Sequence, residues 1–271
     1  MTHTSPIFER LFSLSGKTAL VTGASGGIGQ ILAVALAEAG AAVAVHGRTP
    51  SNVEKARSLV EANGGQAVSL TSDVSSVDAC RQLIAEAHTA LGRLDILVNS
   101  AAINRRKPIV EVTEDDYNTI MAVNLRSIYF LCQAAQPIMQ AQGGGKIINV
   151  GSVNSGFGLG TVSVYGATKG GLAQVSRVMA IEWAQDNIQV NCLTPGFMLT
   201  PLTEEPLWGN VQRRTWLQNR IPARRPGNPD ELVGATLLLA SEASSYMTGT
   251  SVVVDGGFLA GGSWEADLPQ G

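Results

Sequence analysis

The sequence predicts an α/β protein built around one doubly wound parallel β-sheet with helices on both faces. Short apolar runs rich in β-branched residues alternate with amphipathic helical stretches along the whole chain. The apolar runs are nearly continuous, as expected for parallel strands that are covered on both faces. With right-handed crossovers, this alternation gives a single wound sheet.

The predicted elements follow one another without a break that would divide the chain. Strands are expected at residues 18–22, 42–46, 67–70, 94–98, 146–150, 189–193 and 251–254, and helices at 28–39, 53–62, 77–91, 114–140, 162–184 and 229–241. Gly40 and Gly92 stand where helices end in a left-handed residue, and Thr113 and Asn228 are suited to be N-caps. Residues 1–271 are therefore predicted to form one domain, with 1–15 as an N-terminal extension.

Residues 195–227 depart from this alternation and are expected to be irregular. The segment is rich in proline, tryptophan and arginine. A connection of this length in a compact domain is usually functional. We therefore interpret 195–227 as a lid over the substrate.

Composition excludes several classes of protein. Hydrophobic residues make up 45% of the chain and charged residues 15%, which favours a large core over disorder. The net charge is −3 with no basic run, so no nucleic-acid partner is expected. The longest apolar run, residues 31–45, contains Glu38 and Gly40 and is too short for a membrane span. The N-terminus lacks the pattern of a signal peptide, so we expect a cytoplasmic protein.

The cysteines and histidines predict neither a disulfide framework nor a metal site. The three cysteines are scattered and odd in number, and the three histidines form no ligand cluster. These residues are Cys80, Cys132, Cys192, His3, His46 and His88.

A glycine-rich turn follows the first predicted strand and opens a helix. It reads Thr22-Gly-Ala-Ser-Gly-Gly-Ile-Gly29, with the spacing Gly-x-x-x-Gly-x-Gly. Such glycines let the backbone approach a ligand, and a helix N-terminus offers free N–H groups to an anion. The turn therefore predicts a nucleotide site.

A serine, a tyrosine and a lysine form the second motif. Tyr165 and Lys169 lie four residues apart in a predicted helix, so their side chains share one face. Ser152 stands at the end of the predicted strand 146–150. Alone, such a pair is more often packing than chemistry, but with a nucleotide site it indicates proton transfer to or from an alcohol or carbonyl.

Together with Asn124, these motifs resemble the short-chain dehydrogenase/reductase family over residues 16–257. Further matches are Asp73-Val74, Asn99, Pro195-Gly196 and Asp255-Gly-Gly257. The resemblance implies a nicotinamide-dependent oxidoreductase with a seven-stranded Rossmann-type sheet, and a homotetramer or homodimer. One departure is visible, because the family's Asn-Asn-Ala-Gly reads Asn99-Ser-Ala-Ala102 here.

The resemblance also implies roles for individual residues. Tyr165 would be the general acid/base, Ser152 would bind the substrate oxygen, and Asn124 would hold a relay water near Lys169. Lys169 would bind the nicotinamide ribose and lower the pKa of Tyr165. A phenol of pKa about 10 must lose about 3 units to act as a base near neutral pH, and a lysine charge about 5 Å away would supply most of this.

The expected cofactor site is drawn from both halves of the chain. Gly23, Ser25 and Ile28 would line the pyrophosphate, Asp73 and Val74 the adenine, Asn99 a ribose, and Pro195, Gly196 and Met198 the nicotinamide amide. The set is completed by Gly27, Gly29, Gly47, Arg48, Thr49, Ala101, Tyr165, Lys169 and Thr200.

The end of the second strand favours NADP over NAD. An acidic residue there would accept hydrogen bonds from the 2′-hydroxyl of NAD. This chain instead has Gly47 followed by Arg48, and arginine suits a 2′-phosphate. The alternative is an arginine on a surface turn.

An anionic small-molecule substrate is suggested by arginines after the fourth strand. Arg105 and Arg106 lie there, and with Ser152, Asn154 and Tyr165 they form the expected substrate site. The lid segment offers further cations for an anionic substrate, namely Arg213, Arg214, Arg224 and Arg225. A solvated basic loop is the alternative. Segments 103–108 and 220–227 resemble the gluconate 5-dehydrogenase and 2-deoxygluconate dehydrogenase group.

The expected activity is therefore NADP-dependent interconversion of a secondary alcohol and a ketone on a sugar acid such as gluconate. Two alternatives stay open. One is a reductase of a neutral or acyl ketone of the 3-oxoacyl type, and the other is a non-catalytic NADP-binding sensor.

Overall fold

The sheet of this protein has seven parallel strands in the order β3-β2-β1-β4-β5-β6-β7, as a computed structural model describing residues 5–262 shows. The strands are β1 (Thr18–Thr22), β2 (Ala42–Gly47), β3 (Gln66–Thr71), β4 (Ile96–Asn99), β5 (Gly145–Val150), β6 (Ile188–Pro195) and β7 (Ser251–Val254). The chain winds outward from β1 in one direction and from β4 in the other. The predicted doubly wound parallel sheet is confirmed.

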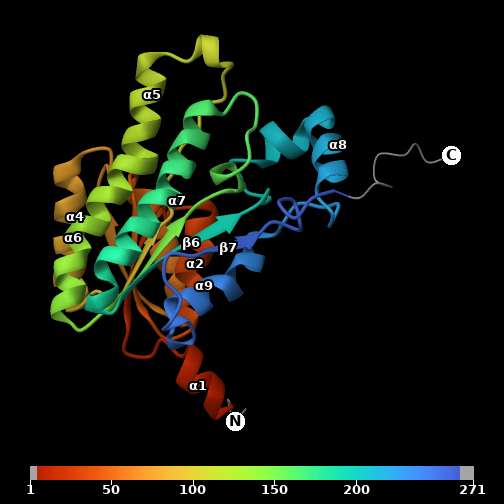
Figure 1. Ribbon diagram of the computed structural model, residues 1–271. Coiled ribbons are helices and arrows are strands. Elements are labelled where there is room, and N and C mark those ends of the chain that lie inside the picture. The colour runs from red at the N-terminus through yellow and green to blue at the C-terminus, as the bar shows by residue number, and fades with distance from the viewer. Residues whose placement is uncertain (1–4, 263–271) are drawn as a thin grey trace.

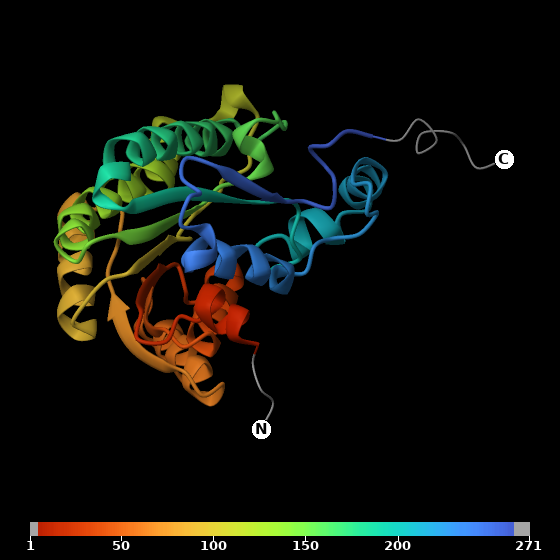
Figure 2. The same ribbon diagram turned by 60° about the horizontal axis from the view of Figure 1, so that its bottom comes forward.

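Helices cover both faces of this sheet (Figures 1 and 2). One layer contains α2 (Gly27–Glu38), α3 (Pro50–Ala62) and α9 (Val233–Ala240). The other contains α4 (Val77–Leu91), α6 (Ser127–Ala141) and α7 (Ser163–Trp183), and α5 (Glu114–Met121) precedes α6. The helix α1 (Pro6–Phe12) lies near α9, and 3₁₀ turns occupy Ile109–Glu111, Val153–Ser155, Ala184–Asp186, Pro229–Leu232 and Glu242–Ser244.

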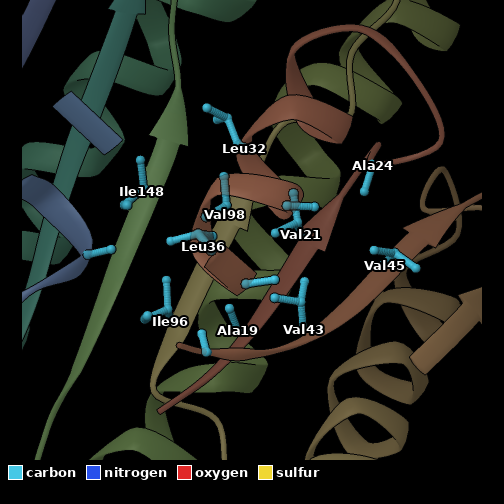
Figure 3. Close-up of a cluster of buried hydrophobic side chains, with 14 of the residues drawn as sticks. Ala19, Val21, Ala24, Leu32, Leu36, Val43, Val45, Ile96, Val98 and Ile148 are labelled. Carbon is cyan, nitrogen blue, oxygen red and sulfur yellow. The ribbon is translucent and has the colours of Figure 1, made fainter. Parts of the chain in front are cut away.

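Alternate residues of each inner strand pack into separate cores. Ala19 and Val21 of β1 lie under Leu32 and Leu36 of α2 (Figure 3), whereas Leu20 belongs to the core on the opposite face. Each such buried leucine stabilises the fold by about 1.5–3 kcal/mol. The two-sided burial explains why these strands are apolar throughout.

The outermost strands differ from this pattern. Residues of β3 and β7 are partly or largely exposed, while the five strands between them are almost fully buried. Each outer strand has a neighbour on one side only. The edge strands are therefore less buried than the interior strands, although residues of β3 still pack against the cores on both faces.

Two predicted helices are interrupted. The helix expected at 114–140 is divided by a π-helical turn, Ala122–Arg126, between α5 and α6. Such turns occur frequently at functional sites, and this one contains Asn124. The helix expected at 229–241 begins with the 3₁₀ turn Pro229–Leu232 before α9.

The segment 195–227, which the sequence predicted to be irregular, is irregular at both ends and helical in the middle. It contains a π-helical turn, Glu204–Gly209, and the helix α8 (Val211–Arg220). The side chain of Asn210 accepts a hydrogen bond from Arg213 N at 3.0 Å, which caps α8. Figure 1 shows α8 beyond the ends of β6 and β7. Its apolar anchor is the buried Leu217.

Residues 5–262 were also compared with what a membrane span or a metal site would require. No helix in that range is both long and apolar enough to cross a bilayer. No group of three or more His, Cys, Asp or Glu within the same range is arranged to hold a metal. The three cysteines are free and buried.

Candidate active site

Two adjoining cavities lie at the carboxyl edge of the sheet. The first has a volume of about 610 Å³ and runs from the glycine-rich turn to residues 198–203. The second, of about 340 Å³, lies between the loop after β4 and α8. Ser152 and Tyr165 line both cavities. A molecule in either cavity would therefore meet the same hydroxyl and phenol.

The glycine-rich turn is held in shape by close packing. Gly23 has φ +68°, and a Cβ there would lie 2.7 Å from the Cα of Ala101. A Cβ on Gly29 would lie 2.5 Å from the carbonyl oxygen of Gly23. Any larger residue at either position would push the turn away from β4 or from its own helix. The local fold thus requires both glycines.

The start of α2 forms an open cradle that fits a pyrophosphate. Its N-cap is Gly26, which offers no side chain to the first N–H groups of the helix. Cβ atoms on Gly26 or Gly27 would meet nothing within 4 Å. Free N–H groups beside open space are what an anion at a helix N-terminus needs. These residues can hold a dinucleotide phosphate.

The end of β2 offers this cavity a cation rather than an acid. Arg48 lines the cavity and is exposed. A Cβ on Gly47 would lie 2.7 Å from Ser25 Oγ, so a larger residue there would require Ser25 to shift. Burial lowers the pKa of His46 to about 4, so this neighbour is neutral. The pKa of Asp73 is lowered chiefly by the backbone N–H of Ser75, and the charge of Arg48 contributes.

The proton-transfer groups meet where the two cavities join. Lys169 is buried, and its Nζ donates a hydrogen bond to the carbonyl oxygen of Val150 at 2.7 Å. The same ammonium lies 5.6 Å from the centre of the Tyr165 ring. Ser152 Oγ accepts a hydrogen bond from Asn154 N at 3.1 Å. Because α7 packs against the end of β5, the hydroxyl, the phenol and the ammonium converge.

The pKa of Tyr165 does not follow the expectation from the sequence. Burial raises it, and the Ser152 hydroxyl and the Arg106 charge only partly oppose this effect. Burial also lowers the pKa of Lys169 to about 8. Desolvation favours the neutral form of both groups. It therefore keeps the Tyr165 phenol protonated and makes the neighbouring Lys169 ammonium easier to deprotonate. In the protein alone, Lys169 therefore does not bring the pKa of Tyr165 below its usual value.

Most of the predicted cofactor residues line the first cavity. They are Gly23, Ser25, Gly27, Ile28, Gly29, Gly47, Arg48, Asp73, Val74, Ala101, Tyr165, Lys169, Pro195, Gly196, Met198 and Thr200. Asn99 and Thr49 do not. Asn99 is buried within the sheet, where its Nδ2 donates to Asn149 Oδ1 at 2.8 Å. Thr49 is exposed and precedes α3. The expectation that Asn99 contacts a ribose through its side chain does not fit this placement.

Asn124 also lies outside both cavities and has a different partner from the one expected. Its Oδ1 accepts from Ile103 N at 2.8 Å, and its Nδ2 donates to Ile103 O at 2.8 Å. The side chain, fully buried in the π-helical turn, thereby fixes the loop that follows β4.

The loop after β4 separates the two predicted substrate arginines. Arg105 pairs with Asp115 at 2.7 Å and with Asp116 at 3.0 Å, and Lys107 pairs with Asp116 at 2.6 Å. Arg106 lines the second cavity instead. Burial and the charge of Arg213 lower its pKa. The structure therefore brings Arg106 to the site, and Arg105 is held on the outer side by α5.

Several residues that line the second cavity were outside the expected substrate site, among them Asn104 and Trp216, and Arg213 was named only as one of four lid arginines. Asn104 is two residues before Arg106 and lines the same cavity, but it lies in a loop, where no periodic pattern could have identified it. Arg213 and Trp216 reach the cavity from α8. The sequence marked the lid region as rich in arginine and tryptophan, but not which of them face inward. Asn154 lines this cavity as expected.

Comparison with known proteins finds similarity to reductases and dehydrogenases. A family model described as enoyl-(acyl carrier protein) reductase matches residues 23–259. Gluconate 5-dehydrogenase of Gluconobacter oxydans is 41% identical over 247 residues, which cover 91% of this chain and 96% of that protein. 2-Dehydro-3-deoxy-D-gluconate 5-dehydrogenase of Escherichia coli is 42% identical over 253 residues, covering 92% and 98%.

A solved structure gives the same result in three dimensions. The crystal structure of a gluconate 5-dehydrogenase from Burkholderia cenocepacia, in complex with NADP and tartrate, has a TM-score of 0.88 and 39% sequence identity. The alignment covers 92% of this chain and 97% of that one. The fold and nearly the whole length are therefore shared.

Proposed function

The chain belongs to the short-chain dehydrogenase/reductase family of oxidoreductases, and we propose that it interconverts a secondary alcohol and a ketone on a sugar acid, with NADP as cofactor. The observation that carries this proposal is the charge of the second cavity. Arg106 and Arg213 line it beside Tyr165, and within residues 5–262 no Asp or Glu does. Two cations without a counter-ion favour an anionic substrate.

Tyr165, Ser152 and Lys169 have separate roles in the proposed reaction. Alcohol oxidation removes a proton from the hydroxyl and a hydride from its carbon. Tyr165 Oη takes the proton. The Ser152 hydroxyl hydrogen-bonds to the substrate oxygen that loses this proton. Lys169, fixed on Val150, orients the ribose side of the site. When bound, NADP supplies the hydride acceptor and, in its oxidised form, a positive charge that favours the phenolate. Ketone reduction runs the same transfers in reverse.

NADP is favoured by Arg48, which can bind a 2′-phosphate at the end of β2. The names of similar structures agree, since one gluconate 5-dehydrogenase and one 2-deoxy-D-gluconate 3-dehydrogenase were crystallised with NADP. Relatives named as acting on gluconate or a deoxygluconate derivative likewise favour a sugar acid over a neutral or acyl ketone.

We further propose that residues 1–271 act as one domain, with 195–227 as a lid, and that the protein is a cytoplasmic homotetramer or homodimer. Exposed apolar residues on α6 and α7 support self-association, because such side chains are commonly covered by a partner. They are Tyr129, Val178 and Ile181. Light scattering of the purified protein would measure the assembly.

A substrate panel tests the activity. The purified protein is mixed with NADP or NADPH and with gluconate, 5-oxogluconate, a neutral ketone or a 3-oxoacyl thioester, and the NADPH absorbance is followed. Turnover with the sugar acids and much less with the other ketones is expected. A preference for the 3-oxoacyl thioester would favour the alternative reductase. NADP binding without any turnover would favour a sensor.

A further inference from the structure

Asn104 has a side-chain oxygen for which the protein provides no partner. The Oδ1 atom is buried, and no donor among residues 5–262 reaches it. Asn104 lines the second cavity together with Arg106 and Tyr165. Buried polar atoms are nearly always paired, so an orphaned acceptor beside a catalytic group needs an explanation. A ligand in the cavity would supply the missing donor.

The loop around Asn104 is fixed before any ligand arrives. Asn124 holds both backbone groups of Ile103 from the interior. On the outer side, Lys107 pairs with Asp116, and its N–H donates to the carbonyl oxygen of Thr161 at 2.9 Å. Asn104 lies between these two anchors. The backbone on both sides of Asn104 is therefore fixed at the cavity wall, and positioning the residue costs little when a substrate binds.

We infer that Asn104 is a specificity residue that binds a hydroxyl group of a polyhydroxylated acid, next to the carboxylate held by Arg106. An acceptor requires a donor, and a carbon-bound hydroxyl is the donor that a sugar acid carries beside its carboxylate. Since a hydroxyl both donates and accepts, it satisfies the amide in either orientation. A simple oxo acid or an acyl chain would leave the oxygen unpaired. This inference rests on the proposed function and narrows its substrate class.

The test combines enzyme variants with substrate variants. Wild type, Asn104→Leu and Asn104→Ala are assayed with gluconate and with its monodeoxy analogues that keep the reacting hydroxyl, at saturating NADP. Leucine has nearly the shape of asparagine, and alanine removes the amide without adding bulk. Asn118→Leu is the matched control, because Asn118 is exposed on α5 and lines neither cavity.

For wild type and Asn118→Leu, we expect at least one deoxy analogue to lose about tenfold in kcat/KM relative to gluconate. In both Asn104 variants that difference should disappear, because gluconate loses the contact that the analogue already lacks. An unchanged ratio in the Asn104 variants would overturn the inference while leaving the proposed function intact. Absence of turnover with every sugar acid would overturn both.

Discussion

Replacing Arg106 with alanine should raise the KM for a sugar acid strongly, whereas replacing Arg105 should leave it nearly unchanged. The two arginines are adjacent, yet Arg106 lines the second cavity and Arg105 is engaged by Asp115 and Asp116. The pair therefore offers a matched comparison within one loop. It separates a substrate contact from general damage to that segment.

The expected magnitude follows from the surroundings of Arg106. The side chain is partly buried, and its pKa is affected by burial, Arg213 and Tyr165, with no carboxylate partner among residues 5–262. A carboxylate bound there would make a charge-assisted hydrogen bond worth about 1.5–3 kcal/mol. Its loss corresponds to about 10- to 150-fold in affinity. Arg105→Ala removes the ion pairs with Asp115 and Asp116, but Asp116 keeps Lys107 as a partner and the lining of the second cavity is unchanged.

Initial rates at saturating NADP measure the effect. Because the Arg106 charge also lowers the pKa of Tyr165, a neutral substrate is assayed in parallel, and the ratio of the two KM changes isolates the carboxylate contact. Arg106→Lys should recover only part of the affinity, since lysine lacks the planar fork. Equal KM values for the two alanine variants would refute the assignment of Arg106 as the carboxylate ligand.

The remaining predictions concern the proton, the cofactor and the buried lysine. Tyr165→Phe should lower kcat by about 10²- to 10⁴-fold while NADP binding, followed by fluorescence titration, stays intact; a wild-type kcat would exclude the phenol as acid/base. Arg48→Ala should raise the KM for NADP but not for NAD, and a wild type that already prefers NAD would contradict the assignment. Combining Arg48→Ala with Gly47→Asp would not test cofactor preference cleanly, because the Cβ of the aspartate would lie 2.7 Å from Ser25 Oγ. The lowered pKa of Lys169 predicts a pH effect on stability. Between about pH 8 and its ordinary value of 10.5, the unfolded chain binds this proton and the native protein does not, so the free energy of unfolding should rise with pH. Urea unfolding of wild type and Lys169→Met without cofactor should show the stability of wild type rising relative to that of the variant over this range, and parallel curves would contradict it.

The sequence by itself determined the sheet, the glycine-rich turn and the residues of the proton-transfer group. Continuous apolar strands and amphipathic helices are local patterns, and each reports directly on burial. The glycines at 23 and 29 are read from the sequence for the same reason, because only glycine fits a backbone that approaches another so closely. Tyr165 and Lys169 share a helix face through their spacing alone.

The tertiary structure decided which side chains face the site. Asn99 and Asn124 stand in the expected segments, but the Nδ2 of Asn99 donates to Asn149, and both polar atoms of the Asn124 side chain bind the backbone of Ile103. The sequence could not choose between Arg105 and Arg106, because the choice depends on two aspartates of α5 that lie about ten residues later. Such pairing is a property of packed elements rather than of local spacing.

The pKa of Tyr165 illustrates the same limit. Spacing placed a lysine near the phenol and suggested a lower pKa, but burial affects both groups and reverses the direction for the protein alone. Desolvation depends on everything that surrounds an atom, including α7, β5 and the residues around the cavities. Sequence spacing predicts which charged groups lie near one another. Their exposure to water, and with it their pKa values, depends on the folded structure.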